Sequence, residues 1–349
     1  MSSHQKKIAF LFFMIVVALG INIIPRTGKI ITVKDELRAG NESLSLISLE
    51  SKAAVFPSSD ALETNMRIGP ENSYGEKTIG SGGATEGAFT APLVSSLPPF
   101  KQTSEVFPPQ ITATIAFVGD VESGVSYLEK GTNRHWPVAS ITKLMTAVVA
   151  SRVLSSDAHL TVTTEDLPKD QDAGSAYLKP GEEYLVSDLI EMMLIASDNV
   201  AAETLARTYG REKFLSKMNE QARLWGMSKT YYYDLSGLSP VNQSSADDLE
   251  KLAFQLVTEE KKVLNISRKP GTEVTEQISK RQYRVLPINT FAGRSDFVGG
   301  KTGFIDEAGG NLFSIFSVKG RPVLIIVFSS SARFEDTTRL LGWFKENYE

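Results

Sequence analysis

The sequence HWPVASITKLMTAVVASRVL, residues 135–154, places a serine and a lysine three positions apart at the start of a predicted helix. Pro137 precedes an apolar run with helical spacing, so we expect the helix to begin near Ala139. Ser140 then lies in the first turn, and Lys143 stands on the same face. This stretch is therefore the framework around which we interpret the rest of the chain.

A serine hydroxyl and a lysine amine at this spacing form the pattern S-x-x-K, which suits nucleophilic catalysis. The hydroxyl needs a base to take its proton, and a lysine can serve only if burial or a neighbouring cation holds it partly neutral. Free backbone N–H groups at a helix start would stabilise the oxyanion formed on attack. The pattern alone is weak evidence, because it also occurs at Ser3 to Lys6 near the terminus.

Composition excludes several classes of function. The chain has 349 residues, of which 42% are hydrophobic and 22% charged, and a net charge of −4 without a basic patch, so we expect no nucleic-acid partner. It contains no cysteine, and its three histidines are too scattered for a metal cluster. Any acid–base chemistry must therefore use other side chains.

Three segments are expected along the chain. Residues 1–24 contain an apolar run that is either a secretory signal or a membrane anchor; it continues beyond the small residues at 18–20, which favours the anchor. Residues 25–108 are rich in Gly, Ser and Pro and are predicted to be a disordered linker, with a reach on the order of 50 Å. Residues 109–349 are predicted to form the catalytic domain.

The order of elements predicts an α+β fold. Two β-rich runs follow residue 111, and residues 297–332 give three strand-like runs with a hairpin turn at Lys319-Gly320. Helices are expected between them. After the Ser140 helix, the next one starts at Ser187, which is expected to be its N-cap, and residues 333–348 close the chain as a helix. We therefore expect an antiparallel sheet flanked by helices, with a mostly helical lobe inserted. The other expected helices cover residues 200–209, 211–225 and 245–258, whereas residues 261–286 give no clear pattern.

Two further short motifs offer polar side chains. The triplet SDN at residues 197–199 interrupts an apolar helical stretch; it is either a cap between helices or a break from which Ser197 and Asn199 project into a cleft. The triplet KTG at residues 301–303 lies on the first late strand, where a lysine and a threonine could hold a carboxylate and a glycine lets a ligand approach. Alone it would be a solvated strand end.

Together, S-x-x-K, S-x-N and K-T-G occur in the order typical of enzymes that acylate a serine. The chain resembles the low-molecular-mass penicillin-binding proteins, the serine D-alanyl-D-alanine carboxypeptidases and endopeptidases of bacterial cell walls. The resemblance covers residues 109–348 and includes the segments 178–182, 189–206 and 236–249. It implies a β-lactamase/DD-peptidase-like fold, peptidoglycan stem peptides as substrates, covalent inhibition by β-lactams such as penicillins, and no metal or organic cofactor.

The resemblance also implies roles for individual residues. Ser140 would be the nucleophile, Lys143 the general base, and Ser197 the proton relay to the leaving amine. The backbone N–H groups of Ser140 and Phe304 would form the oxyanion hole. The residues implied to bind substrate are Asn199 for the acyl-donor amide, Lys301 and Thr302 for the terminal carboxylate, and Gly303 and Phe304 beside them.

Departures from the family pattern leave alternatives open. Many carboxypeptidases of the family have a further β-rich domain and S-G-N as the middle motif; the sequence shows neither, which makes it more like the endopeptidase branch. A β-lactamase is a second alternative, although no E-x-x-L-N loop occurs between Asn199 and Lys301, where only Asp234 offers a carboxylate in the loop before Gly237. A non-catalytic, membrane-tethered sensor is the third. The expected location is the bacterial cell envelope, outside the cytoplasm, with one N-terminal helix anchored in the cytoplasmic membrane.

Overall fold

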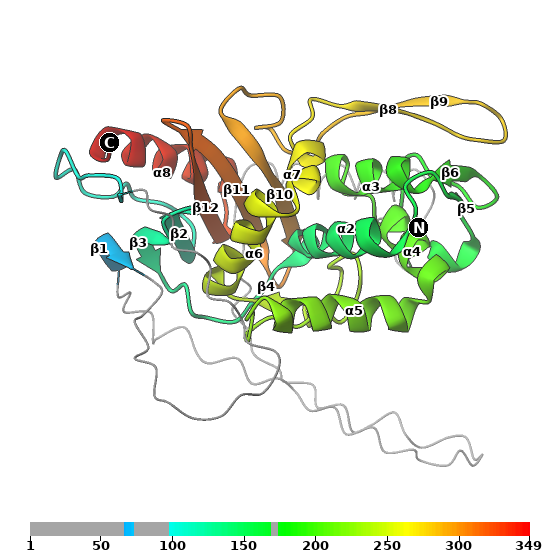
Figure 1. Cartoon of the computed structure of the whole chain (residues 1–349), viewed down its shortest axis with the longest axis horizontal. Helices are drawn as coiled ribbons and strands as arrows, with labels where there is room; N and C mark the ends of the chain where they lie inside the picture. Colours follow the sequence, from blue (N-terminus) through cyan, green and yellow to red (C-terminus); the bar gives the residue numbers. More distant parts are fainter. Residues whose placement is uncertain (1–65, 73–97, 169–173) are drawn as a thin grey trace, which may run out of the picture. The chain divides into compact units, whose positions relative to one another are not determined.

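The central sheet is built from both ends of the folded part of the chain (Figure 1). The computed structural model describes residues 66–72, 98–168 and 174–349. Six antiparallel strands lie in the order β1-β3-β2-β12-β11-β10. The predicted α+β architecture with an antiparallel sheet is therefore confirmed. The strands are β1 (Met66–Asn72), β2 (Ile115–Asp120), β3 (Val125–Lys130), β10 (Phe297–Ile305), β11 (Gly309–Val318) and β12 (Arg321–Ser330).

Alternating side chains of the sheet bury two separate hydrophobic layers. On β12, Val323 and Ile325 face a cluster that includes Phe344 of the closing helix α8 (Arg333–Asn347). The intervening Leu324 and Ile326 face a second cluster shared with the helical lobe. Because successive strand residues point to opposite faces, a strand covered on both sides is apolar throughout. This explains the unbroken run of hydrophobic residues in β12.

A mostly helical lobe is inserted between β3 and β10, as the sequence predicts (Figure 1). Its other helices bury apolar stripes around α2, whose residues 142–150 are all buried, and the lobe packs against one face of the sheet. Short strands link them. The elements are β4 (Trp136–Pro137), η2 (Ala139–Ile141), α2 (Thr142–Val153), β5 (His159–Thr161), η3 (Thr164–Asp166), β6 (Glu183–Leu185), α3 (Val186–Ile195), α4 (Asn199–Tyr209), α5 (Arg211–Leu224), β7 (Gln243–Ser244), α6 (Ala246–Thr258), α7 (Lys261–Ser267), β8 (Thr272–Thr275) and β9 (Gln282–Val285).

Two local predictions need correction. Helix α3 begins at Val186, and its N-cap is Leu185 without a side-chain hydrogen bond, so Ser187 is not the cap. The short strand β6 runs directly into α3 and fixes its start by pairing with β5, which a cap signal in the sequence does not reveal. The stretch 261–286, which showed no clear pattern, contains helix α7 and the hairpin of β8 and β9.

The folded part starts earlier than residue 109. Phe100 is buried against the rings of Tyr127 and Phe344, and the backbones of Lys101 and Glu349 exchange two hydrogen bonds of 2.6 and 2.9 Å. Strand β1 also lies inside the predicted linker and pairs with β3. A single buried aromatic residue among Gly, Ser and Pro gives no periodic signal. Its partner in α8, Phe344, is more than 200 residues away along the chain.

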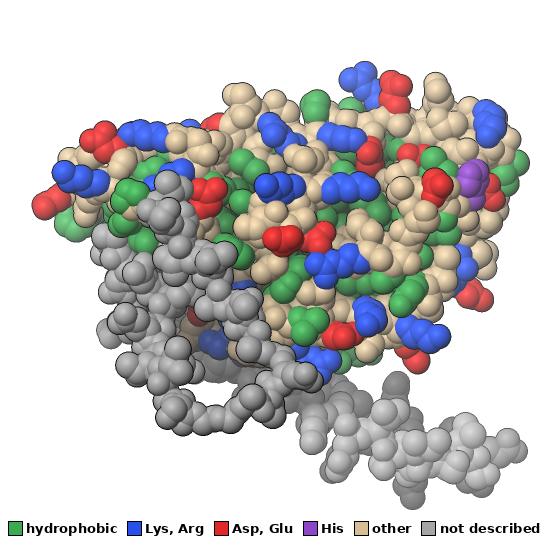
Figure 2. Space-filling view, viewed as in Figure 1, with side chains coloured by type: hydrophobic (Ala, Val, Ile, Leu, Met, Phe, Trp, Pro, Cys, Tyr) green, Lys and Arg blue, Asp and Glu red, His purple; other side chains and the backbone are tan. Residues whose placement is uncertain are grey.

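The predicted anchor at residues 1–24 and the rest of the predicted linker lie outside the described residues. Within the described ranges, no helix has both the length and the hydrophobicity needed to span a membrane. On the face drawn in Figure 2, lysine and arginine side chains are spread among acidic and apolar ones.

Candidate active site

Ser140 lies in a tight turn directly ahead of α2. Residues 139–141 form a 3₁₀ turn, and the α-helix begins at Thr142, three residues later than predicted. Ala139 has a φ of +49°, outside the right-handed helical region, so the chain cannot enter the helix at that residue. The strained turn presents Ser140, which is partly exposed, at the corner between β4 and α2.

Lys143 is fully buried, and its amine has three hydrogen-bond partners. Lys143 Nζ lies 2.9 Å from Ser140 Oγ, 2.7 Å from Asn199 Oδ1 and 2.6 Å from the backbone oxygen of Ser236. Burial lowers the pKa of this lysine to about 8, although the carboxylates of Asp234, Asp198 and Glu203 act in the opposite direction. A fraction of the amine is therefore neutral near pH 7, and the neutral form can accept a proton.

The structure brings the second motif next to the third. Lys301, also buried, donates from Nζ to Ser197 Oγ at 2.8 Å and to its neighbour's backbone oxygen, Thr302 O, at 3.0 Å. Ser197 has a φ of +61° and lies in the middle of the break between α3 and α4. Burial lowers the pKa of Lys301 well below its usual value, and the positive charges of Lys143 and Arg333 lower it further.

Asp198, between the two polar residues of the S-x-N motif, has a structural explanation. One of its carboxylate oxygens accepts from the backbone N–H of Ala201 at 2.9 Å, which caps α4 and places Asn199 at its first position. The other oxygen accepts from the hydroxyl of Ser175. The cap and the projecting side chains, which the sequence offered as alternatives, thus coexist.

Strand β10 passes directly beside the Ser140 turn. A Cβ on Gly303 would lie 2.8 Å from Val138 O and 3.2 Å from Ser140 N, so only glycine allows this approach. Thr302 is buried, and the side chain of Phe304 is 60% exposed. The structure therefore brings all the sequence-predicted residues together around the Ser140 turn and the adjoining part of β10: Ser140, Lys143, Ser197, Asn199, Lys301, Thr302, Gly303 and Phe304.

Sequence reasoning missed Arg333, at the start of α8. Its guanidinium donates from Nη1 to the backbone oxygen of Gly303 at 3.0 Å, and its charge contributes to the lowered pKa of Lys301. The residue is half-buried, and burial lowers its own pKa. An arginine 30 residues beyond the K-T-G motif carries no local signal that could have identified it. It adds a second cation to this end of the site.

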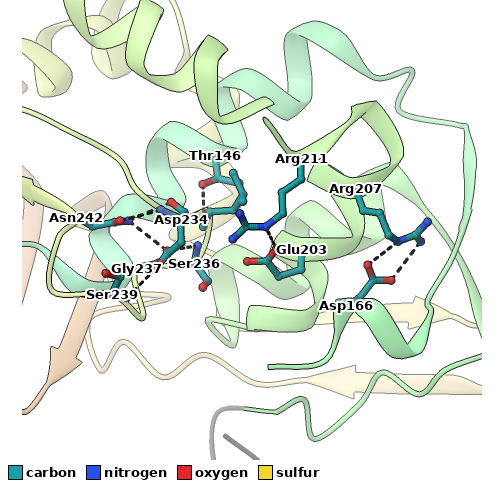
Figure 3. Close-up of polar contacts among 11 residues, drawn as sticks. Thr146, Asp166, Glu203, Arg207, Arg211, Asp234, Ser236, Gly237, Ser239 and Asn242 are labelled. Atoms are coloured by element: carbon teal, nitrogen blue, oxygen red, sulfur yellow. Dashed lines mark hydrogen bonds and ion pairs between the residues drawn. The ribbon is translucent and has the colours of Figure 1, made fainter. Parts of the chain in front are cut away.

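The loop at residues 234–242 contacts the Ser140 turn, and its role was also missed. Figure 3 shows the hydrogen bonds that Asp234 makes within this loop. Asn242 donates from Nδ2 to Thr142 Oγ1 at 2.9 Å, and its backbone oxygen accepts from Val138 N at 3.0 Å. Gly237 has a φ of +82°, and a Cβ there would lie 1.9 Å from Ala139 O. The S-G-L segment at 236–238 was the available signal. The resemblance includes this segment within residues 236–249 but implies no role for it.

A metal site is not found among the described residues, since no three side chains of His, Asp or Glu there are arranged to hold an ion. The groups that the arrangement does offer are a hydroxyl, two buried lysines and backbone N–H groups. Such a set can form and break an ester on Ser140.

The comparison with family models finds D-alanyl-D-alanine carboxypeptidase over residues 101–332. A D-alanyl-D-alanine endopeptidase from Pseudomonas aeruginosa is 30% identical over 73% of this chain and 84% of its own length. A protein of the same name from Haemophilus influenzae is 36% identical over 51% of this chain, and the match spans 62% of its length. Penicillin-binding protein D2 from Listeria monocytogenes, solved in a cefotaxime-bound form, is 31% identical with a TM-score of 0.60, covering 69% of this chain and 98% of that one.

Proposed function

This chain belongs to the D-alanyl-D-alanine carboxypeptidase family, and we propose that it is a serine DD-peptidase acting on peptidoglycan stem peptides. One observation carries the proposal: the fully buried Lys143 amine lies 2.9 Å from Ser140 Oγ and has a lowered pKa. A base and a nucleophile in contact, with the base partly neutral near physiological pH, are the requirement for serine acylation.

The reaction would proceed in two halves through an ester on Ser140. Ser140 Oγ attacks the carbonyl carbon of the penultimate residue while its proton moves to Lys143 Nζ. The C–N bond then breaks: the Ser197 hydroxyl gives its proton to the leaving amine while Ser197 Oγ takes up the proton held on Lys143, so both residues return to their starting protonation states. Because Lys301 donates to Ser197 Oγ, the hydroxyl hydrogen of Ser197 is free to point at the leaving group. Water hydrolyses the ester and restores Ser140.

Substrate binding would use the groups along β10. Lys301, Thr302 and Arg333 supply two cations and a hydroxyl for the terminal carboxylate, and charge-assisted hydrogen bonds of this kind are the strong ones. Asn199 would orient the acyl-donor amide. The backbone N–H groups of Ser140 and Phe304 would form the oxyanion hole, since Gly303 allows β10 to lie against the Ser140 turn.

Two kinds of bond are candidates for cleavage, the terminal D-Ala-D-Ala bond and a peptide cross-link. We favour the cross-link, because the Haemophilus influenzae and Pseudomonas aeruginosa relatives carry the name endopeptidase. Incubation of the protein with a pentapeptide muropeptide and with a cross-linked dimer, followed by mass analysis, distinguishes the two. Loss of the terminal alanine from the pentapeptide, with the dimer intact, would reverse this preference. The Ser140→Ala variant, which loses a hydroxyl and no core volume, should process neither.

The β-lactamase and sensor alternatives predict different fates for penicillin. We expect a penicilloyl ester on Ser140 that lasts minutes or longer, because the sequence between Asn199 and Lys301 contains no E-x-x-L-N loop, whose glutamate activates the deacylating water in a β-lactamase. A β-lactamase with ordinary turnover of about 10 per second would clear the ester at once. A sensor would hold the ester without processing any muropeptide. Intact-protein mass after a brief penicillin pulse, together with the muropeptide assay, separates all three.

The location proposed for this activity is the bacterial cell envelope, where the substrate lies. We infer from the apolar run at residues 8–24 that the protein is held at the cytoplasmic membrane by this segment and acts outside the cytoplasm. Fractionation of cells that produce the full chain tests this. Recovery in the wash of intact cells or in the periplasmic fraction, without membranes, would contradict the anchor.

A further inference from the structure

The three partners of the Lys143 amine are not equivalent. Asn199 Oδ1 and the backbone oxygen of Ser236 can only accept hydrogen bonds, whereas Ser140 Oγ can both donate and accept. A protonated amine has three hydrogens and satisfies all three partners. A neutral amine has two hydrogens and one lone pair. If the two acceptor-only oxygens take the two hydrogens, the lone pair is left pointing at the hydroxyl of Ser140.

The Ser236 carbonyl is held in place by one buried carboxylate. Asp234 accepts from the backbone N–H groups of Ser236 at 3.0 Å and Gly237 at 2.6 Å through Oδ1, and from that of Ser239 at 2.7 Å through Oδ2 (Figure 3). These three bonds wrap the loop around the carboxylate. The Asp234 side chain itself is nearly buried, with 7% exposed. Its position therefore determines where the Ser236 oxygen lies.

We propose that Asp234 is a positioning residue for acylation: by fixing the Ser236 carbonyl against Lys143, it directs the lone pair of the neutral amine toward Ser140. This inference rests on the proposed function of Lys143 as the base. Asp234 does not touch the substrate or the nucleophile in this arrangement. Its action is transmitted through two residues of backbone and one hydrogen bond of 2.6 Å.

The charge of Asp234 has a second consequence. Among the carboxylates that raise the pKa of Lys143 against the effect of burial, Asp234 is the strongest, followed by Asp198, the N-cap of α4, and Glu203 within α4. The nearby cation is Lys301 on β10, whose own lowered pKa reflects Lys143. Removing the Asp234 charge should therefore lower the pKa of the base, so that acylation begins at lower pH.

Two substitutions separate position from charge. In Asp234→Asn the amide oxygen can still accept from Ser236 and Gly237, so we expect a plateau rate within about tenfold of wild type. The apparent pKa of acylation should fall by about one unit. In Asp234→Ala the loop loses all three bonds, and displacement of the carbonyl by about 1 Å should reduce the plateau roughly 100-fold.

Thr146→Val provides the matched neutral control. Thr146 Oγ1 donates to Leu235 O at 2.7 Å, so this nearly isosteric change loosens the same loop without altering charge. We expect its apparent pKa to equal that of wild type. The measurement is the rate of acylation by a fluorescent penicillin from pH 6 to pH 10, with thermal melting as a check of folding.

Each outcome decides the proposal. A wild-type plateau in Asp234→Ala would overturn it, and so would an equal pKa change in Asp234→Asn and Thr146→Val. If Asp234→Ala does not fold, the plateau rate of Thr146→Val decides the positioning, because this variant loosens the same loop without altering charge and a wild-type plateau in it would overturn the proposal. Absence of acylation in the wild-type protein would instead contradict the proposed function, which keeps the two failures distinct.

Discussion

The close contact between Gly237 and the Ser140 turn leads to a prediction that compares two glycines. Gly237 and Gly320 have nearly the same φ, +82° and +84°, so an alanine at either position adopts the same disfavoured conformation. Their surroundings differ completely. A Cβ on Gly237 would lie 1.9 Å from Ala139 O, 2.3 Å from Ala139 C and 2.9 Å from Ser140 N, whereas a Cβ on Gly320 would have no atom within 4 Å.

The conformational cost common to both alanines is about 1–2 kcal/mol in free energy of unfolding. At Gly237 the added carbon overlaps backbone atoms that cannot rotate away, and overpacking adds roughly 1–3 kcal/mol. We therefore expect Gly237→Ala to lose about 2–5 kcal/mol and Gly320→Ala about 1–2 kcal/mol. Urea unfolding measures both values, and the difference between them isolates the steric contact.

The effect on activity should be more selective than the effect on stability. Relief of a 1.9 Å contact requires the Ala139–Ser140 peptide to move by more than about 1 Å, and a misplacement of this size can reduce a rate roughly 100-fold. Gly320→Ala, in the hairpin turn between β11 and β12, should acylate at the wild-type rate. The assay is labelling by a fluorescent penicillin at a pH where the wild-type rate is maximal. Labelling of Gly237→Ala within threefold of wild type would refute the inferred contact between the loop and the nucleophile turn.

Three further predictions address the chemistry of the site. Because burial lowers the pKa of Lys143 to about 8 and the neutral amine is the active form, the acylation rate should rise about tenfold from pH 7 to pH 9; a flat profile would contradict Lys143 as the base. Arg333→Gln should reduce kcat/KM for a peptide with a free terminal carboxylate by roughly 10- to 100-fold, and an unchanged value would mean that the arginine serves only the Gly303 backbone. Amidation of that carboxylate should reduce kcat/KM by a larger factor in wild type than in Arg333→Gln, which retains only Lys301 and Thr302 as partners; equal factors in the two enzymes would argue against a contact between Arg333 and the carboxylate.

The sequence by itself determined the local features of this protein. Ser140 and Lys143 are three residues apart, and the 3₁₀ turn that runs into α2 places them on one face, as a helical spacing predicts. The alternation of cap-forming and apolar residues located most helices, and the apolar runs of the late strands predicted the sheet. In each case the interacting residues are close in sequence, so a periodic or short motif records the interaction.

Only the tertiary structure decided the contacts between distant segments. The Ser236 carbonyl meets Lys143 across 93 residues, and Ser197 meets Lys301 across 104. A backbone carbonyl has no signature in the sequence, because every residue has one, and its role depends on where the loop folds. The same reason explains why the burial of Phe100 against α8 was not predicted. Long-range packing is set by the shape of the whole core, which no local pattern encodes.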